Sequence, residues 1–219
     1  MLTNTREEQI YASVLADGKF HVTVYKDTPN AKLREYETSD GKKGEKWELT
    51  YDTLTGTISK INFFDGDFGK SLQITLTDGE NEPVVMSLST ASSFGEDVLK
   101  KLPNIDQNKP VKFVPYSFED AGKVHKGITI TQDGVKLGNY FQRKEVIDGK
   151  NVWTNLYGYP EAPKPKKNKK TGEDVPLSSD EWKIYYTQVR LFLIDYVTEH
   201  CGIADVNESV VEPVKQDDF

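Results

Sequence analysis

The 219-residue sequence predicts a mainly β protein, in which a small barrel carries extra strands on its N-terminal side and an amphipathic helix on its C-terminal side. Three observations favour this fold class. Short segments of alternating polar and apolar residues, bounded by turn residues, run from Phe20 to Tyr159. One short helical pattern interrupts these segments after Ser89, and a longer amphipathic pattern follows at 179–201.

The first six predicted strands are read from their alternation and from the turn residues between them. They are the segments FHVTVYK, KLREYET, EKWELTYD, TGTISKINFF, KSLQITLTDG and EPVVMSLS. The glycine-containing stretch SDGKKG predicts a hairpin between the second and third. Within SLQITLT, apolar Leu72, Ile74 and Leu76 alternate with polar residues, so these three side chains are predicted to face the core.

A short helix is predicted at SSFGEDVLKKL. Ser93 and Glu96 have the spacing of a capping box, and Pro103 bars continuation of the helix. The apolar stripe of this helix consists of Phe94, Val98, Leu99 and Leu102.

Two further strands, PVKFVPYSF and KGITITQDG, follow the helix, and GVKLGNYFQ is a possible extension. Three strands, a helix and two strands, from Thr53 to about Phe141, have the order of an OB-fold barrel. The same strand count also permits a β-sandwich. Phe94, Phe113 and one of the pair Phe63 and Phe64 are expected in the core.

The C-terminal part is predicted to contain a hairpin, a loop, a helix and a tail. Asp148-Gly149 predicts the turn of a hairpin that completes a domain over 1–160. A basic flexible loop is expected at 161–178, a helix packed on the domain at 179–202, and an acidic tail at 203–219. Ser178 and Glu181 form a second capping-box pattern. The helix face expected to be buried consists of Trp182, Tyr185, Tyr186, Val189, Phe192, Leu193, Tyr196 and Val197.

The charge of the chain is unevenly distributed. The net charge is -7, but from Lys109 to Thr171 there are 13 Lys and Arg against 6 Asp and Glu. Electrostatic footprints are local, so a basic middle is compatible with a polyanionic partner despite the acidic total. The alternative is that these lysines only keep a β-rich surface soluble.

Catalysis and cofactor binding are not expected. His21, His125 and His200 lie in separate elements, and a single cysteine, Cys201, excludes a multi-cysteine metal site and a disulfide framework. No nucleophile elbow or phosphate-binding loop is present, and Asp65 and Asp67 are best explained as solvated turn residues. No apolar run long enough to span a bilayer occurs, so a cytoplasmic location is expected.

Aromatic residues lie beside basic residues on several predicted strands and loops. An aromatic face stacks on any base, and a lysine or arginine pairs with the phosphate of each step, so this combination is typical of sequence-independent binding to single-stranded DNA. The expected groove consists of Lys60, Phe64, Lys112, Tyr116, Arg143, Lys144 and Trp153. Further candidates for DNA contact are Lys46, Trp47, Lys70, Tyr140, Lys150 and Tyr157.

With its OB-like strand order, its aromatics among lysines and its ending Asp217-Asp218-Phe219, the sequence resembles the phage-type single-stranded DNA-binding proteins. The resemblance implies a protein of DNA replication, recombination and repair that coats single strands. It also implies that Asp217, Asp218 and Phe219 recruit a polymerase, helicase or nuclease. The tail lacks the long glycine-, proline- or glutamine-rich linker of many such proteins. The alternative is a non-enzymatic protein-interaction module of a phage or replication assembly that docks through the helix at 179–201.

Overall fold

The computed structural model describes residues 9–38, 41–67, 69–168 and 170–202, and it is mainly β. Ten strands form one mixed sheet in the order β10-β9-β8-β5-β6-β7-β1-β2-β4-β3. They are β1 (Ile10–Val14), β2 (Phe20–Val24), β3 (Lys32–Glu37), β4 (Lys43–Tyr51), β5 (Leu54–Gly66), β6 (Gly69–Thr77), β7 (Val84–Ser89), β8 (Val111–Asp120), β9 (Lys123–Gln132) and β10 (Val135–Lys136).

Two small ribbons and two α-helices complete the described fold. The ribbons pair β11 (Gln142–Ile147) with β12 (Lys150–Asn155), and β13 (Lys166–Lys167) with β14 (Asp174–Val175). The helices are α1 (Ser93–Lys101), which continues into the 3-10 turn η1 (Leu102–Asn104), and α2 (Ser179–His200). Among the described residues, no helix has the length and apolar character needed to cross a membrane.

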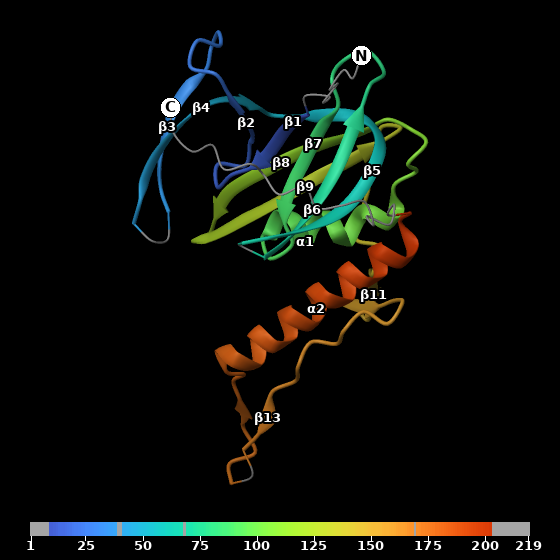
Figure 1. Ribbon diagram of the computed structural model, residues 1–219. Coiled ribbons are helices and arrows are strands. Elements are labelled where there is room, and N and C mark those ends of the chain that lie inside the picture. The colour runs from blue at the N-terminus through green and yellow to red at the C-terminus, as the bar shows by residue number, and fades with distance from the viewer. Residues whose placement is uncertain (1–8, 39–40, 68, 169, 203–219) are drawn as a thin grey trace.

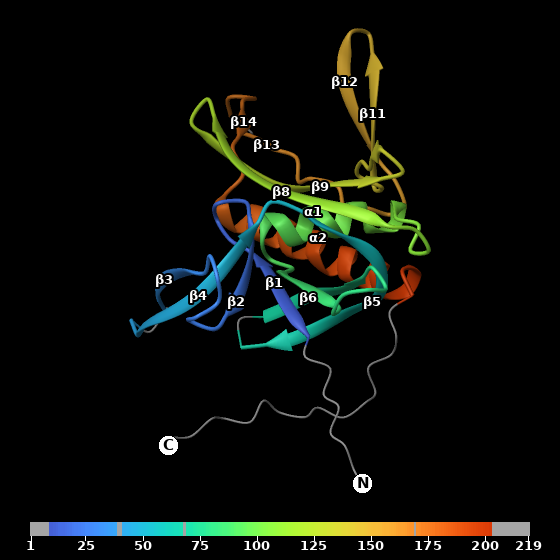
Figure 2. The same cartoon turned by 90° about the horizontal axis from the view of Figure 1, so that it is seen from above.

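Strand β5 folds the sheet into two layers. Its first residues pair with β8 and the remainder pairs with β6, and the register shifts at a bulge between Ile58 and Lys60. The layer of β5, β6 and β7 therefore faces the layer of β8 and β9 (Figures 1 and 2). Leu72 and Ile74 from one layer and Phe113 from the other are fully buried in one core cluster.

The ten-stranded sheet does not close into a barrel, so the predicted closure is wrong. The two edges that a barrel would join are already occupied. Strand β1, which was not predicted, pairs in parallel with the edge of β7. On β9, the N–H of Ile128 donates to Asp97 of α1 at 2.7 Å, and its carbonyl accepts from Lys101 of α1 at 2.8 Å. Both backbone groups of Ile128 are therefore hydrogen-bonded to α1 and not to a neighbouring strand of a barrel.

The predicted side-chain directions in the central strands are confirmed. Leu76 is buried together with Leu72 and Ile74, and Phe94 and Phe113 lie in the core. Of the adjacent pair, Phe63 packs against the core and Phe64 is exposed.

The cap of α1 differs from the prediction by one residue. Ser92, not Ser93, is the N-cap, and its hydroxyl accepts from the Gly95 N–H at 3.0 Å. Ser92 is extended, with φ -85° and ψ 154°, whereas Ser93 is already the first helical residue and cannot cap its own helix.

Helix α2 has its predicted capping box at Ser178 and Glu181, but only its C-terminal half is buried as predicted. Val189, Leu193 and Val197 are buried, whereas Tyr186 is 54% exposed. The N-terminal end of the helix diverges from the sheet (Figure 1), and of its aromatic residues Tyr185 still packs against the core while Tyr186 faces solvent.

Replacing Asp97 with alanine is expected to lower the free energy of unfolding by about 2–3 kcal/mol. The change leaves the Ile128 N–H and the buried Lys101 ammonium without their shared carboxylate. Urea titration measures the effect. Asp52→Ala is the control, because Asp52 pairs with exposed Lys19 and its loss should cost less than about 1 kcal/mol. Equal losses for both variants would contradict this role of Asp97.

Candidate nucleic-acid interface

The structure divides the predicted DNA-contacting residues among four places. Lys46 and Trp47 lie on β4, and Lys60, Phe64 and Lys70 lie on the β5–β6 hairpin. Lys112 and Tyr116 lie on β8. The remaining residues lie together on the β11–β12 hairpin and at its base: Tyr140, Arg143, Lys144, Lys150, Trp153 and Tyr157. Asp217, Asp218 and Phe219 lie outside the described residues.

The β5–β6 and β8 positions do not share one surface. Phe64 pairs with Ser71, and Lys60 pairs with Thr75, on the side of β6 opposite to buried Leu72 and Ile74. Lys112 and Tyr116 likewise alternate with the buried side chain of Phe113. Since the inward faces of the two layers meet in the core, the outward faces point away from each other. These residues cannot line one groove.

The β11–β12 hairpin projects away from the sheet (Figure 2). Its turn consists of Asp148 and Gly149, with φ of 51° and 74°, which are the left-handed values of a type I′ turn. All twelve strand residues except Gln142 and Asn155, at the base of the hairpin, are exposed. The hairpin therefore presents both of its faces to solvent.

One face of this hairpin combines an aromatic ring with a cation. Lys144 is directly opposite Trp153 in the antiparallel register, so their side chains stand next to each other. The Trp153 side chain is 58% exposed. Arg143 and Lys150 belong to the opposite face, where the opposed pair Glu145 and Val152 lies between them. Both faces thus carry a positive charge beside an apolar surface.

The base of the hairpin is held by a chain of side-chain amides. Asn139 donates to Gln142 at 3.0 Å, and Gln142 donates to Asn155 at 3.0 Å. Asn155 in turn donates to the carbonyl of Pro160, also at 3.0 Å. These bonds tie the two strands to the segments that enter and leave them, so the direction of the hairpin is fixed at its base.

Two tyrosine rings form a second platform beside this base. Tyr157 stacks on Tyr140, with the ring centroids 4.4 Å apart and an angle of 6° between the planes. Tyr157 is 55% exposed and has φ of 55°, a conformation that is unfavourable for a residue with a large side chain. Strained residues cluster at functional sites, which makes the outer face of Tyr157 a candidate contact.

Helix α2 supports this platform with two residues that the sequence did not identify as part of the site. The hydroxyl of Tyr196 donates to that of Tyr140 at 3.2 Å, and the Tyr196 ring stacks on His200 at 4.1 Å between centroids. Their i, i+4 spacing on the predicted helix indicates that the two rings lie side by side, and this pattern could have identified them in the sequence. The hydrogen bond with Tyr196 raises the pKa of Tyr140 above its ordinary value. The interaction with Tyr140 likewise raises the pKa of Tyr157, so these rings stay uncharged at neutral pH.

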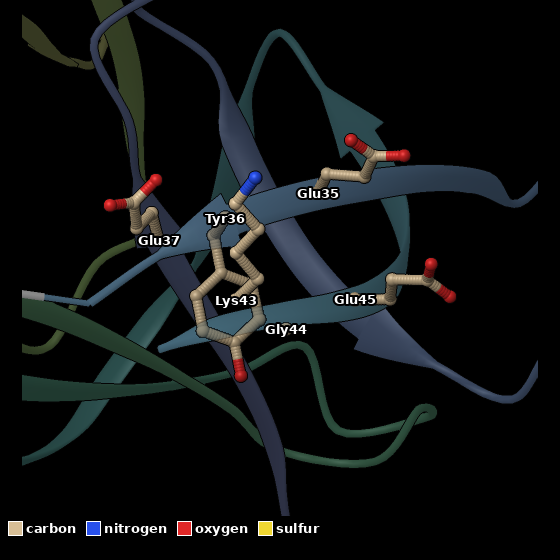
Figure 3. A pocket seen from close by; sticks show the side chains of 6 residues that line it. All are labelled: Glu35, Tyr36, Glu37, Lys43, Gly44 and Glu45. Atoms are coloured by element: carbon tan, nitrogen blue, oxygen red, sulfur yellow. The ribbon is translucent and has the colours of Figure 1, made fainter. Parts of the chain in front are cut away.

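The β3–β4 hairpin has two electrostatically different faces. On one face, Lys46 lies 5.2 Å from the centroid of the Tyr36 ring, a cation–π contact. Figure 3 shows Glu35 and Glu37 on the other side of the strand, pointing away from Tyr36. Together with Glu45 and Lys43, these two glutamates are among the side chains that line a hollow of about 730 Å³. With three carboxylates against one ammonium, this hollow is unsuited to a polyanion. Trp47 belongs to this second face, so Lys46 and Trp47 do not act together.

A buried ion network fixes the basic face of this hairpin. Arg34 donates to both oxygens of Glu48, at 2.7 and 2.8 Å. Nδ1 of His21 lies 2.9 Å from Glu48, and its Nε2 lies 3.0 Å from Asp17. The hydrogen bond from Arg34, followed by that from His21, lowers the pKa of Glu48 below its ordinary value.

The comparisons with known proteins give no relative. No protein-family model matches the chain, and no curated protein and no solved structure matches it either.

Replacing Glu48 with glutamine is expected to lower the free energy of unfolding by about 2 kcal/mol at pH 7, because Arg34 loses its buried carboxylate. The folded-state pKa of Glu48 is depressed, so its contribution is complete above the ordinary pKa and is lost as the pH falls through the folded value. The difference between wild type and variant, measured by urea titration, should therefore shrink below about pH 4. Glu45→Gln, on the exposed acidic face, should show neither effect. A difference that is constant down to pH 2 would contradict the assignment.

Proposed function

We propose that the protein binds single-stranded DNA without sequence preference and takes part in DNA replication, recombination or repair. The observation that carries this proposal is the projecting β11–β12 hairpin, in which exposed Trp153 stands beside Lys144 and whose base carries the Tyr140–Tyr157 platform. The protein acts as a binding protein and not as an enzyme.

The chemistry of these residues suits an unpaired strand. An unstacked base gains about 1–3 kcal/mol from an aromatic face, whatever its identity. Lys144 lies on the face of Trp153, whereas Arg143 and Lys150 lie on the opposite face. We expect a bound strand to contact these cations on both sides of the hairpin, and each phosphate contact releases counterions. Affinity is therefore expected to fall steeply with salt. A duplex hides the faces of its bases and should bind less tightly.

We further infer that β5 to β9, together with α1, form an opened OB-type unit. Strand β5 pairs with both β6 and β8, and α1 lies between β7 and β8 in the chain, as the strand order of that fold requires. Strand β1 takes the edge of β7 along which such a barrel closes. The unit then serves as the support from which the hairpin projects.

The acidic tail is proposed to recruit partner proteins. Asp217 and Asp218 can pair with lysine or arginine, and Phe219 can fill an apolar pocket. A polymerase, helicase or nuclease with a basic rim around such a pocket is the expected partner. The expected place of action is the cytoplasm, that of the host if the protein is encoded by a phage.

A protein-interaction module remains the second candidate, favoured by the exposed part of α2. Ile184, Tyr186 and Leu191 are all more than half exposed on this helix. A docking scaffold of this kind would bind DNA weakly, and its affinity would not depend on Trp153.

Replacing Trp153 with alanine is expected to weaken binding to a fluorescein-labelled poly-dT oligonucleotide by about 5- to 100-fold, because one stacking platform is lost. Fluorescence anisotropy at two salt concentrations measures the affinity. Tyr25→Ala is the matched control, because Tyr25 is 87% exposed at the end of β2, outside the hairpin, and its loss should change little. Equal affinity of wild type and Trp153→Ala would overturn the assignment of this site.

Combined replacement of Arg143, Lys144 and Lys150 with alanine is expected to reduce the slope of log affinity against log salt by about 2, since each phosphate contact to a single strand contributes roughly 0.7. The same titration repeated at four or five salt concentrations gives the slope. Replacing Lys26, Lys32 and Lys136 instead removes the same number of charges outside the β11–β12 hairpin. Equal slope changes in the two triple variants would show that the charges of the hairpin have no special part.

A further inference from the structure

Among the described residues, no strand pairs with either long edge of the β11–β12 hairpin. In a hairpin with a two-residue turn, the pair that closes the turn is hydrogen-bonded, and here it is Ile147 with Lys150. Along the strands, hydrogen-bonded pairs then alternate with pairs whose N–H and C=O groups point away from the hairpin. The alternation predicts that Phe141 and Leu156, the next pair beyond the base, are also hydrogen-bonded. The Leu156 N–H indeed donates to the Phe141 carbonyl at 2.8 Å. The N–H and C=O groups of Asn151 and Trp153 therefore point outward from β12.

An isolated two-stranded hairpin is marginally stable in water, and an edge without charge invites pairing with another strand. Four apolar side chains are exposed on this hairpin: Val146, Ile147, Val152 and Trp153. The sequence of β12, KNVWTN, carries a charge only at its first residue and consists otherwise of polar amide, β-branched and aromatic residues. This edge thus lacks the devices with which proteins protect exposed strands.

We propose that the β12 edges of two copies of this chain pair antiparallel about a two-fold axis at Trp153, so that two hairpins form one four-stranded sheet. This inference rests on the proposed function, because it describes the surface that meets the DNA. In this register Asn151 faces the partner's Asn155, and Val152 faces the partner's Thr154. No two like charges oppose each other, as a stable pair requires.

Strand β11 is the less suitable edge because it carries three charged residues, whereas β12 carries a charge only at Lys150. A two-fold axis at Arg143, Lys144 or Glu145 places that residue opposite its own copy, so each of these registers includes a pair of like charges. The β12 register around Trp153 avoids such a pair.

The partner copy contributes to the binding face. Lys144 and Trp153 are cross-strand neighbours, and pairing at Trp153 brings the partner's Trp153 to about 5.5 Å between Cα atoms. The shared face then carries a row in the order Lys144, Trp153, the partner's Trp153, the partner's Lys144. One hairpin supplies half of this row, whereas two supply adjacent stacking platforms with a cation at each end. The ligand of this face is a single strand with at least two unstacked bases.

Sedimentation equilibrium of the full chain tests the pairing with two matched variants. Asn151→Pro removes an N–H that points outward from β12. Val146→Pro is the matched control, because Val146 is the cross-strand partner of Asn151 and its N–H points outward from β11. We expect a wild-type dimer, at least tenfold weaker association of Asn151→Pro, and no change for Val146→Pro. A monomeric wild type would overturn the proposal. So would weaker association of Val146→Pro alone.

Cross-linking tests the register independently. Trp153→Cys places two thiols within disulfide reach across the axis, whereas the thiols of Asn151→Cys would be about 14 Å apart. The natural Cys201 is buried and does not compete. An oxidised dimer of Trp153→Cys alone supports the register, and cross-linking of both variants or of neither contradicts it.

Binding to poly-dT separates this inference from the proposed function. Asn151→Pro should bind at least tenfold more weakly than wild type at concentrations where wild type is a dimer. A monomeric wild type whose binding depends on Trp153 would overturn the pairing and leave the function standing. A dimer that does not bind poly-dT would overturn the function and, with it, the shared face.

Discussion

The bend of β5 is the constraint on which the rest of the structure depends. One strand pairs with β8 through its first residues and with β6 through the remainder, and the bulge between Ile58 and Lys60 lets the sheet turn between them. The inward side chains of both layers then meet in a single core, where Leu72, Ile74 and Phe113 are fully buried. Burial of this apolar surface is the main favourable term in folding. The same packing turns the outward face of β5 and β6 away from the outward face of β8.

Sheet edges explain the remaining architecture. The edge of β7 is paired with β1, and Asp97 and Lys101 satisfy both backbone groups of Ile128 on β9. The outermost strand β3 carries charge at four of its six residues, which discourages pairing. Within the described part of the chain, the long edge of β12 has no paired strand and a charge only at Lys150. Exposed Trp153, with Lys144 beside it, therefore lies on the strand of the hairpin whose edge is least protected.

Local charge matters more than total charge in this protein. Glu35, Glu37 and Glu45 share one face of the β3–β4 hairpin, while Lys46 and Tyr36 share the other. The depressed pKa of Glu48 reflects a carboxylate enclosed by Arg34 and His21, not a free charge on the basic face. A net charge of -7 is thus compatible with surfaces that attract a polyanion.

The sequence by itself determined the local elements, because they depend on neighbours along the chain. Period-2 alternation identified the inward side of β6, Asp148-Gly149 identified the hairpin turn, and Ser178 with Glu181 identified the start of α2. Only the tertiary structure decided which edges meet. It paired β1 with β7 and left the barrel open, and it turned Phe64 and Tyr116 to opposite sides. Those outcomes depend on contacts between residues distant in the chain, and no local pattern encodes them.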